Sequence, residues 1–214
     1  MQRRLKQQAV GEQVRRLRAQ AGMTLRTLAR QAGFSASFIS QLEHGQVSPS
    51  ISSMERIAGV LGVSLVEFFA SVSQADGGLV VRAAQRQELN SGWSNSAVQA
   101  VSPHSSLARL EALMIRLRPG GRSGKHPYAH PREEFAFVLS GRVKLTLGPE
   151  QHALGPGDAA CILPGELRLW HNESRGNAQV LIVTSPLSGS PIRGSKRPAG
   201  SRAPRAQADG GGRA

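Results

Sequence analysis

The chain of 214 residues has one cysteine and no long apolar run. Cys161 has no second cysteine to pair with, so the sequence excludes an intrachain disulfide and any zinc site built from several thiolates. No apolar stretch approaches the ~20 residues of a membrane-spanning helix. The N-terminal segment MQRRLKQQAV is basic but lacks an apolar centre, which argues against a signal peptide. We therefore expect a cytoplasmic protein with no membrane partner.

Acidic residues are scarce: 14 Asp and Glu stand against 27 Lys and Arg, a net charge of +13. The excess lies at the two ends. Residues 1–72 hold nine basic and four acidic residues, and residues 188–214 hold six and one, whereas residues 73–187 are nearly balanced. Such a charge distribution predicts a polyanionic partner, with the ends of the chain contributing most of the attraction.

Residues 11–69 show apolar side chains at helical spacing, interrupted by glycine or polar residues. Gly33 separates the second apolar segment from the third, and Ser35 is placed to cap the third helix through its hydroxyl. A helix, a short turn containing glycine and a second helix form the motif that places a recognition helix in the DNA major groove.

The runs MTLRTLARQAG, FSASFISQLEHG and PSISSMERIAGVLGVSLVEFF follow one another in this segment. In this order and spacing they resemble the Xre-type, phage-repressor-like helix-turn-helix family. The resemblance implies a five-helix bundle that binds a double-stranded DNA operator, and an internal ion pair between Arg18 and Glu43. The alternative for this segment is a small helical protein-interaction module.

The third helix is expected to turn Phe38, Ile39 and Leu42 inward and other residues outward. Glutamine can bridge adenine, serine can pair with either base type, and alanine can touch a thymine methyl. Residues near the helix ends are candidate phosphate contacts. The expected DNA-binding residues are Thr24, Arg26, Ser35, Ala36, Ser37, Ser40, Gln41 and His44.

From Leu79 the pattern changes to short β-branched or alternating apolar segments such as EEFAFVL, RVKLTLG and AQVLIVT. Several short strands at close spacing predict an all-β sandwich or barrel. Cys161, in the strand segment DAACILP, is expected to be a buried small apolar residue. Residues 188–214 are rich in Gly, Pro, Ser, Ala and Arg, a composition that predicts disorder.

The β segment resembles the cupin family of jelly-roll barrels through two motifs. In the first, Tyr128-Ala129-His130 is followed by Glu134 and Gly141; in the second, Gly157-Asp158 and Pro164-Gly165 lead to Arg168 and Asn172. The predicted organisation is therefore a multi-domain α + β chain: a helix-turn-helix domain at 1–72, a linker at 73–78, a cupin domain for sensing and dimerisation at 79–187, and a disordered basic tail at 188–214.

The cupin resemblance implies a metal site at the positions of Tyr128, His130, Glu134 and Arg168, but two of these four depart from the family pattern. Arginine has no lone pair to donate and places a positive charge where the cation would lie. We therefore expect no metal and no cofactor. Arg168 instead suits a bidentate contact to a carboxylate or phosphate. The alternative is that Arg168 simply pairs with Glu134 in a barrel without ligand.

These observations favour a DNA-binding transcription regulator, with a repressor as the leading hypothesis, and no enzymatic activity. A small anionic effector would bind among Tyr128, His130, Glu134, Arg168 and Trp170 inside the barrel. A homodimer is expected, because this type of domain reads paired half-sites. The alternative is a metal-dependent cupin enzyme, an oxygenase or isomerase, with an accessory DNA-binding domain.

Overall fold

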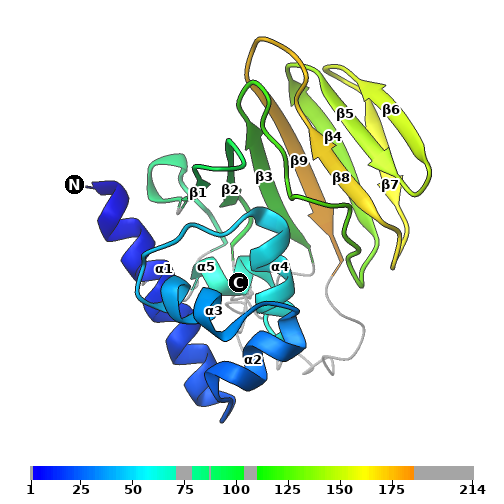
Figure 1. Cartoon of the computed structure of the whole chain (residues 1–214). Helices are drawn as coiled ribbons and strands as arrows, with labels where there is room; N and C mark the ends of the chain where they lie inside the picture. Colours follow the sequence, from blue (N-terminus) through cyan, green and yellow to red (C-terminus); the bar gives the residue numbers. More distant parts are fainter. Residues whose placement is uncertain (1, 71–78, 87, 104–109, 186–214) are drawn as a thin grey trace, which may run out of the picture.

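The computed structural model describes residues 2–70, 79–86, 88–103 and 110–185, which form a bundle of helices beside a β-domain of two sheets (Figure 1). This architecture confirms the predicted multi-domain fold of a five-helix bundle followed by a cupin barrel. The predicted linker at 73–78 and the predicted disordered tail at 188–214 lie outside the described residues. The proposed domain boundaries stay a prediction.

The helical bundle contains α1 (Gln2–Gln20), α2 (Leu25–Ala32), α3 (Ala36–Glu43), α4 (Ile51–Val60) and α5 (Leu65–Ala70). Polar residues fix where the helices begin: the side chains of Thr24, Ser35 and Ser50 accept hydrogen bonds from backbone amides in the first turns of α2, α3 and α4. Gly33 ends α2 with a φ of 69°, the left-handed conformation that glycine adopts without steric cost. The turn between α2 and α3 is therefore defined by local sequence.

The bundle closes around apolar side chains that are inaccessible to solvent, among them Leu28, Ile39, Met54 and Ile57. Gly11 lets α1 cross close to α3, since a Cβ atom there would lie 2.4 Å from the carbonyl oxygen of Leu42. Burying each such large apolar side chain contributes about 1.5–3 kcal/mol. Packing therefore stabilises helices too short to be stable alone.

The β-domain contains two antiparallel sheets. The larger has the order β1 (Glu88–Ser91), β2 (Ser96–Ala100), β3 (Glu111–Leu117), β9 (Ala178–Thr184), β4 (Glu134–Ser140) and β7 (Ala159–Ile162). The smaller has the order β6 (Glu150–Leu154), β5 (Val143–Leu147) and β8 (Arg168–His171), and a bridge between Tyr128 and Arg168 adds the preceding loop to it. Alternate residues of β8 and β9 are buried between the sheets.

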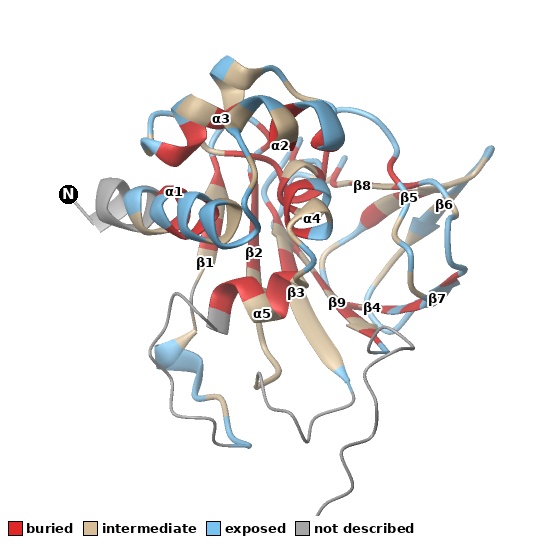
Figure 2. Cartoon of the chain, turned by 90° about the horizontal axis from the view of Figure 1, so that it is seen from below, coloured by how far each residue is buried: buried red, intermediate tan, exposed pale blue. Residues whose placement is uncertain are grey.

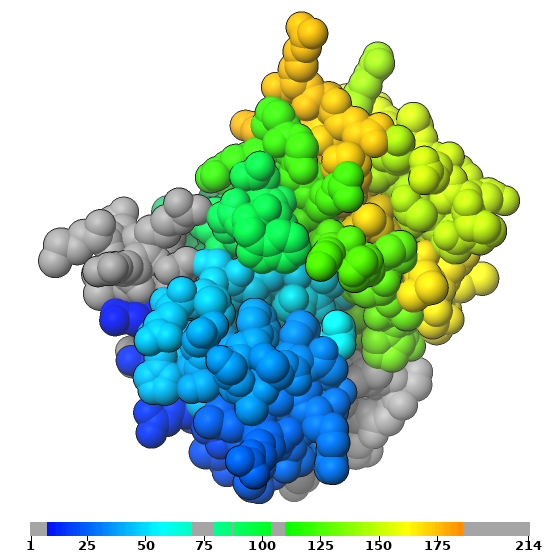
Figure 3. All heavy atoms as spheres, in the orientation of Figure 1, coloured from blue at the N-terminus to red at the C-terminus, as the bar shows by residue number. Residues whose placement is uncertain are grey.

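The helical bundle and the β-domain pack directly against each other, as the space-filling view shows (Figure 3). Helices α4 and α5 contact β2, α5 also contacts β3, and α1 contacts β1. Phe68 and Phe69 on α5 belong to the same continuous apolar core as Val98 on β2. The helical bundle therefore rests on the barrel through a shared apolar core.

The outer face of the larger sheet carries exposed apolar side chains. Phe135 and Leu139 on β4 are 47% and 42% exposed, and Leu163, just after β7, is 61% exposed. Cys161 lies opposite Phe135 on this face and is exposed. The expectation of a buried Cys161 is therefore wrong, because strand alternation turns Ile162 inward and Cys161 outward.

Within the described residues, no helix combines the length and the apolar character needed to cross a bilayer.

Candidate DNA-reading helix and barrel site

Helix α3 lies at an outer edge of the molecule, away from β5 and β6 (Figures 1 and 2). Ser37 and Gln41, one turn apart, are exposed on it, whereas Ala36 and Ser40 are half-buried. At 100° per residue, Ser37 and Gln41 fall opposite the buried Ile39, while Ala36 and Ser40 fall at the margins of the buried stripe. Fewer side chains of α3 are therefore fully exposed to solvent than the sequence predicted.

The inward side of α3 also differs from expectation at Phe38. Ile39 and Leu42 are fully buried, but Phe38 is only half-buried and its ring packs on Phe34, with ring centroids 4.8 Å apart. Phe34 belongs to the turn before α3. The aromatic pair therefore fixes α3 to the turn that precedes it.

The remaining residues predicted to bind DNA lie around the ends of α2 and α3. Thr24 and Ser35 are exposed N-caps, with their hydroxyl oxygens 3.1 Å from the amides of Thr27 and Phe38. Arg26 is exposed on α2, and the exposed His44 ends α3, with Nδ1 2.7 Å from the carbonyl oxygen of Ser40. These positions suit phosphate contacts, and their roles stay predictions.

An ion pair braces α1 against α3. Arg18 donates from Nε and Nη2 to the two carboxylate oxygens of Glu43, at 2.6 and 2.8 Å, and from Nη1 to the carbonyl oxygen of Met23. The expected internal ion pair of Arg18 and Glu43 is therefore present. This bidentate pair holds the recognition helix by its C-terminal end.

In the barrel, Arg168 at the start of β8 is fully buried and surrounded by acceptors. Its Nη2 donates to Glu134 Oε1 at 2.7 Å, Nε contacts the other Glu134 oxygen, and Nη1 donates to the carbonyl oxygen of Tyr128 at 3.3 Å. The guanidinium also lies over the Tyr128 ring, 4.5 Å from its centroid. The pairing of Arg168 with Glu134, left open from the sequence, is thus present.

A third partner of Arg168 comes from the helical bundle. Glu55 on α4 accepts from Nη2 at 3.1 Å through Oε2 and at 3.4 Å through Oε1. The side chain of Glu55 is 10% exposed and that of Arg168 is 0% exposed. One buried arginine therefore holds two carboxylates, one from each domain.

The barrel residues do not fit the metal that cupin barrels often hold. Arg168 donates to the oxygens of Glu134 that would have to bind the cation, and burial raises the pKa of Tyr128 above its usual value, so its phenol stays neutral. Within the part of the chain described, no three His, Cys, Asp or Glu side chains come together as a metal site. His130 and Glu134 alone make a poor donor set.

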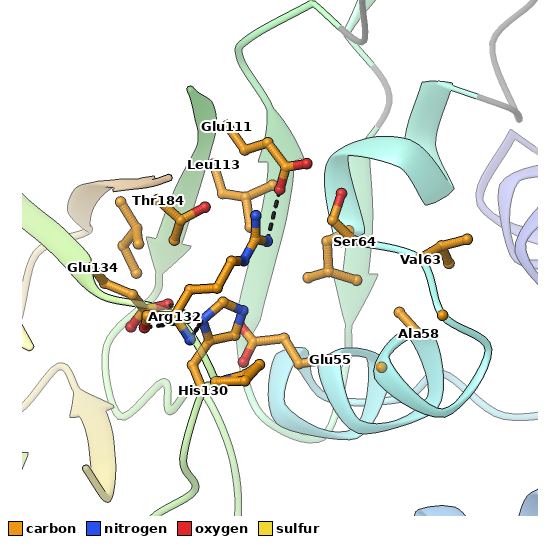
Figure 4. Close-up of a pocket in the computed structure, with 15 residues that line it drawn as sticks. Glu55, Ala58, Val63, Ser64, Glu111, Leu113, His130, Arg132, Glu134 and Thr184 are labelled. Atoms are coloured by element: carbon orange, nitrogen blue, oxygen red, sulfur yellow. Dashed lines mark hydrogen bonds and ion pairs between the residues drawn. The ribbon is translucent and has the colours of Figure 1, made fainter. Parts of the chain in front are cut away.

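A cavity of about 140 Å³ opens between α4, the start of α5 and the barrel (Figure 4). Its polar lining contains Glu55 and Ser64 from the helices and Glu111, His130, Arg132, Glu134 and Thr184 from the barrel. Arg132 donates to Glu111 at 2.7 Å. The cavity therefore has one wall from each domain.

Of the five residues predicted to bind an effector, His130 and Glu134 line this cavity. Tyr128, Arg168 and Trp170 are buried and do not line it, and Trp170 shares the inward face of β8 with Arg168. The sequence missed Glu55, Glu111 and Arg132. Glu111 begins β3 and Arg132 lies two positions after the His130 motif residue, but no local pattern distinguishes Glu55 from any other helical glutamate.

The charges in the cavity shift one another's protonation. Burial raises the pKa of Glu134 to about 7, with Arg168 opposing and Glu55 adding to the rise. Burial lowers the pKa of His130 below its usual range, so its ring is neutral at pH 7. Burial also lowers the pKa of Arg168, but Glu55, Tyr128 and Glu134 outweigh this and hold it above its usual value. Arg168 is thus a permanent cation between two carboxylates.

A recognition helix joined to a jelly-roll barrel defines the class of DNA-binding transcription regulators. Residues 9–68 match the helix-turn-helix domain and residues 113–184 match the cupin domain. The chain is 29% identical over 182 residues to the HTH-type transcriptional regulator PuuR of Escherichia coli, covering 84% of this chain and 96% of that relative. It is 38% identical over 58 residues, 27% of this chain and 75% of the relative, to the uncharacterized HTH-type transcriptional regulator y4dJ of Sinorhizobium fredii.

A solved HTH_3 family transcriptional regulator from Vibrio cholerae has a similar fold over 86% of this chain and 98% of its own, with a TM-score of 0.66 at 22% identity. The chain belongs to the Xre-type helix-turn-helix transcriptional regulators that carry a C-terminal cupin domain.

Proposed function

We propose that this regulator is a repressor whose affinity for its operator is set by a small anionic molecule bound between the barrel and the DNA-binding helices. The observation that carries the proposal is the cavity with one wall from α4 and α5 and the other from the barrel. A ligand there touches both domains, so it binds differently to different domain arrangements. That difference in affinity is what couples a ligand to DNA binding.

The DNA contacts follow from exposure along α3 and its flanks. Ser37 and Gln41 are placed to touch base edges, with Ala36 and Ser40 at the border of the contact. Thr24, Arg26, Ser35 and His44 would contact phosphates and set the register of α3 in the groove. The DNA-reading unit corresponds to residues 1–72 and the sensing unit to residues 79–187.

We expect the working form to be a homodimer joined through the outer face of the larger sheet. Phe135, Leu139 and Leu163 form an exposed apolar patch on that face, and patches of this kind mark association surfaces. We expect a second copy of the chain to cover this patch, because binding two half-sites of an operator requires two DNA-binding domains.

The test uses full-length protein and an operator selected from a pool of random duplexes. Fluorescence anisotropy then measures operator affinity as small carboxylates and phosphates are added at constant ionic strength. The proposal predicts that at least one anion weakens operator binding about fivefold or more. It fails if no anion changes the affinity, or if the effect persists when Arg168→Gln and Glu134→Gln are combined to remove both buried charges.

A further inference from the structure

Glu55 lies where an anionic ligand of the barrel would have to bind. It projects from α4 into the β-domain and places both carboxylate oxygens within 3.4 Å of Nη2 of Arg168. Arg168 is fully buried; its Nε contacts Glu134, its Nη1 donates to the carbonyl oxygen of Tyr128, and its Nη2 donates to Glu134 as well as to Glu55. The Nη2 hydrogen that goes to Glu55 is therefore the donor of Arg168 that a small anion could take over.

The net charge around the cavity determines whether an anion can bind while Glu55 remains in contact with Arg168. Above the pKa of Glu134, which burial raises to about 7, three carboxylates, those of Glu55, Glu111 and Glu134, face two guanidinium groups, those of Arg132 and Arg168. An additional anion would meet a net negative cluster as long as Glu55 stays in place. Once Glu55 leaves, the cluster is neutral and Arg168 regains a free donor, so an anion can bind only by replacing Glu55.

We infer that Glu55 is a built-in competitor of the effector: a small molecule with a carboxylate or phosphate group displaces it from Arg168 and thereby releases α4 from the barrel. This inference rests on the proposed function, because it names how the same cavity controls DNA binding. Binding of the anion and docking of Glu55 exclude each other, so each weakens the other by the same factor.

Helix α4 is built to carry that change to the DNA-reading helix. Arg56, next to Glu55, donates to the carbonyl oxygen of Gly33 at 3.2 Å and lies over the Phe34 ring, 4.5 Å from its centroid. Phe34 packs in turn on Phe38 of α3. Two adjacent residues of α4 thus contact the barrel arginine on one side and the turn before α3 on the other.

The start of α4 is also fixed to the barrel. The amide of Ser52 donates to the carbonyl oxygen of Ser123 at 3.0 Å. Gly124 approaches so closely that a Cβ atom there would lie 2.4 Å from Ser52 Oγ. Of the contacts described between α4 and the barrel, only that of Glu55 with Arg168 is between charged groups. When it is lost, α4 should move and expose the Ser52 amide to solvent.

Acetate is a suitable probe because it carries the same group as the Glu55 side chain. Its dissociation constant is measured by thermal shift and NMR, with chloride keeping the ionic strength constant, for the wild-type protein, Glu55→Gln and Glu12→Gln. Glu12 is an exposed residue of α1, so its variant loses the same charge without touching the cavity. We expect Glu55→Gln to bind acetate about tenfold more tightly than the other two, within the usual range of coupling between sites.

Hydrogen exchange of the α4 amides gives a second reading. Without acetate, the Ser52 amide should exchange faster in Glu55→Gln than in the wild-type protein. As acetate is added, its exchange rate in the wild-type protein should rise to that of Glu55→Gln. The Cβ atom of Gly124→Ala would lie 2.4 Å from Ser52 Oγ and 2.9 Å from Ser52 Cβ, so we expect it to push the start of α4 from the barrel without changing charge. This variant should also exchange the Ser52 amide faster and bind acetate more tightly. Gly176→Ala, where a Cβ atom meets nothing within 4 Å, is its control.

The outcomes separate this inference from the proposed function. One outcome is that the wild-type protein and Glu55→Gln bind acetate equally well and that binding is lost when Arg168→Gln and Glu134→Gln are combined. This outcome would support the anion site but overturn the role of Glu55 as a competitor. Absence of acetate binding in all of these proteins would overturn both. Unchanged exchange of the Ser52 amide in Glu55→Gln would also overturn the release of α4.

Discussion

At the scale of single residues, Arg168 joins the chemistry of the barrel to the DNA-binding bundle. It occupies a position where the cupin pattern has a metal-binding histidine, yet it supplies a fixed positive charge to Glu134 and Glu55. A buried ion pair adds little net stability, but removing one partner leaves the other charge buried and unpaired. Arg168 is therefore needed to neutralise the buried carboxylates beside it, whether or not a ligand is bound.

Replacing this arginine should unfold the barrel more easily. Arg168→Ala leaves Glu134, which is 2% exposed, without its counter-charge, and we expect a loss of about 3–5 kcal/mol of stability by denaturant titration. Arg142→Ala is the matched control, since Arg142 is exposed in the turn after β4, and it should stay within about 0.5 kcal/mol of the parent. Equal, small losses of stability in both variants would show that Arg168 does not neutralise a buried carboxylate that the fold depends on.

Glu134 should make stability depend on pH. Its pKa is raised from 4.5 to about 7 by burial, so the folded state holds this proton up to a higher pH than the unfolded chain does. The free energy of unfolding attributable to Glu134 should then fall as pH rises from about 4.5 to about 7 and level off above. The difference between the wild-type protein and Glu134→Gln, measured across this range, isolates the effect from that of His130. A wild-type protein that gains stability relative to Glu134→Gln as pH rises would contradict it.

The sequence anticipated the residues whose roles depend on local pattern. Capping by Ser35 follows from a helix-cap signal, the inward face shared by Arg168 and Trp170 follows from strand alternation, and the Arg18–Glu43 pair was implied by the family resemblance. Glu55 could not be found this way, because it meets Arg168 across 113 positions of the chain. Only the packing of the two domains creates that contact.

At the scale of secondary-structure elements, close crossings decide how α3 is held. Gly11 brings α1 against the last turn of α3, where a Cβ atom would also lie 2.7 Å from the carbonyl oxygen of Glu43. Neither contact is with a flexible side-chain end. The backbone of one helix or the other would have to move to accommodate a methyl group.

We therefore expect Gly11→Ala to destabilise the protein by about 1–3 kcal/mol through overpacking. Gly59→Ala is the matched control within α4, because its Cβ atom meets nothing within 4 Å, and it should stabilise by about 0.4–1 kcal/mol. Thermal melts of both variants provide the comparison. If Gly11→Ala were as stable as Gly59→Ala, α1 and α3 would not cross in the way described.

The order of elements was predictable, but the exposure along them was predicted less well. The family resemblance implied five helices and the alternating segments predicted the strands after them, whereas Ala36, Phe38 and Ser40 proved half-buried and Cys161 exposed. In an eight-residue helix a small rotation moves marginal residues across the surface boundary. On a sheet, the residues of an apolar strand do not reveal which of its two faces is covered.

At the scale of the whole molecule, the exposed apolar face of the larger sheet predicts a dimer. Phe135→Glu should convert the protein to a monomer in sedimentation, because it places a charge in the centre of the patch. Trp93→Glu is the control: Trp93 is 58% exposed in the turn between β1 and β2, away from β4. A wild-type protein that sediments as a monomer, or a Phe135→Glu protein that stays dimeric, would contradict the assignment.

The most direct test of the account measures sequence-specific DNA binding by α3. Anisotropy titrations at one fixed salt concentration compare the selected operator with a scrambled duplex for the wild-type protein, Gln41→Ala and Gln151→Ala, the last being an exposed glutamine on β6. The account predicts that Gln41→Ala loses about 1–3 kcal/mol on the operator and almost nothing on the scrambled duplex, while Gln151→Ala matches the parent on both. An equal loss on both duplexes, or no loss on the operator, would contradict the claim that this face of α3 reads the DNA sequence.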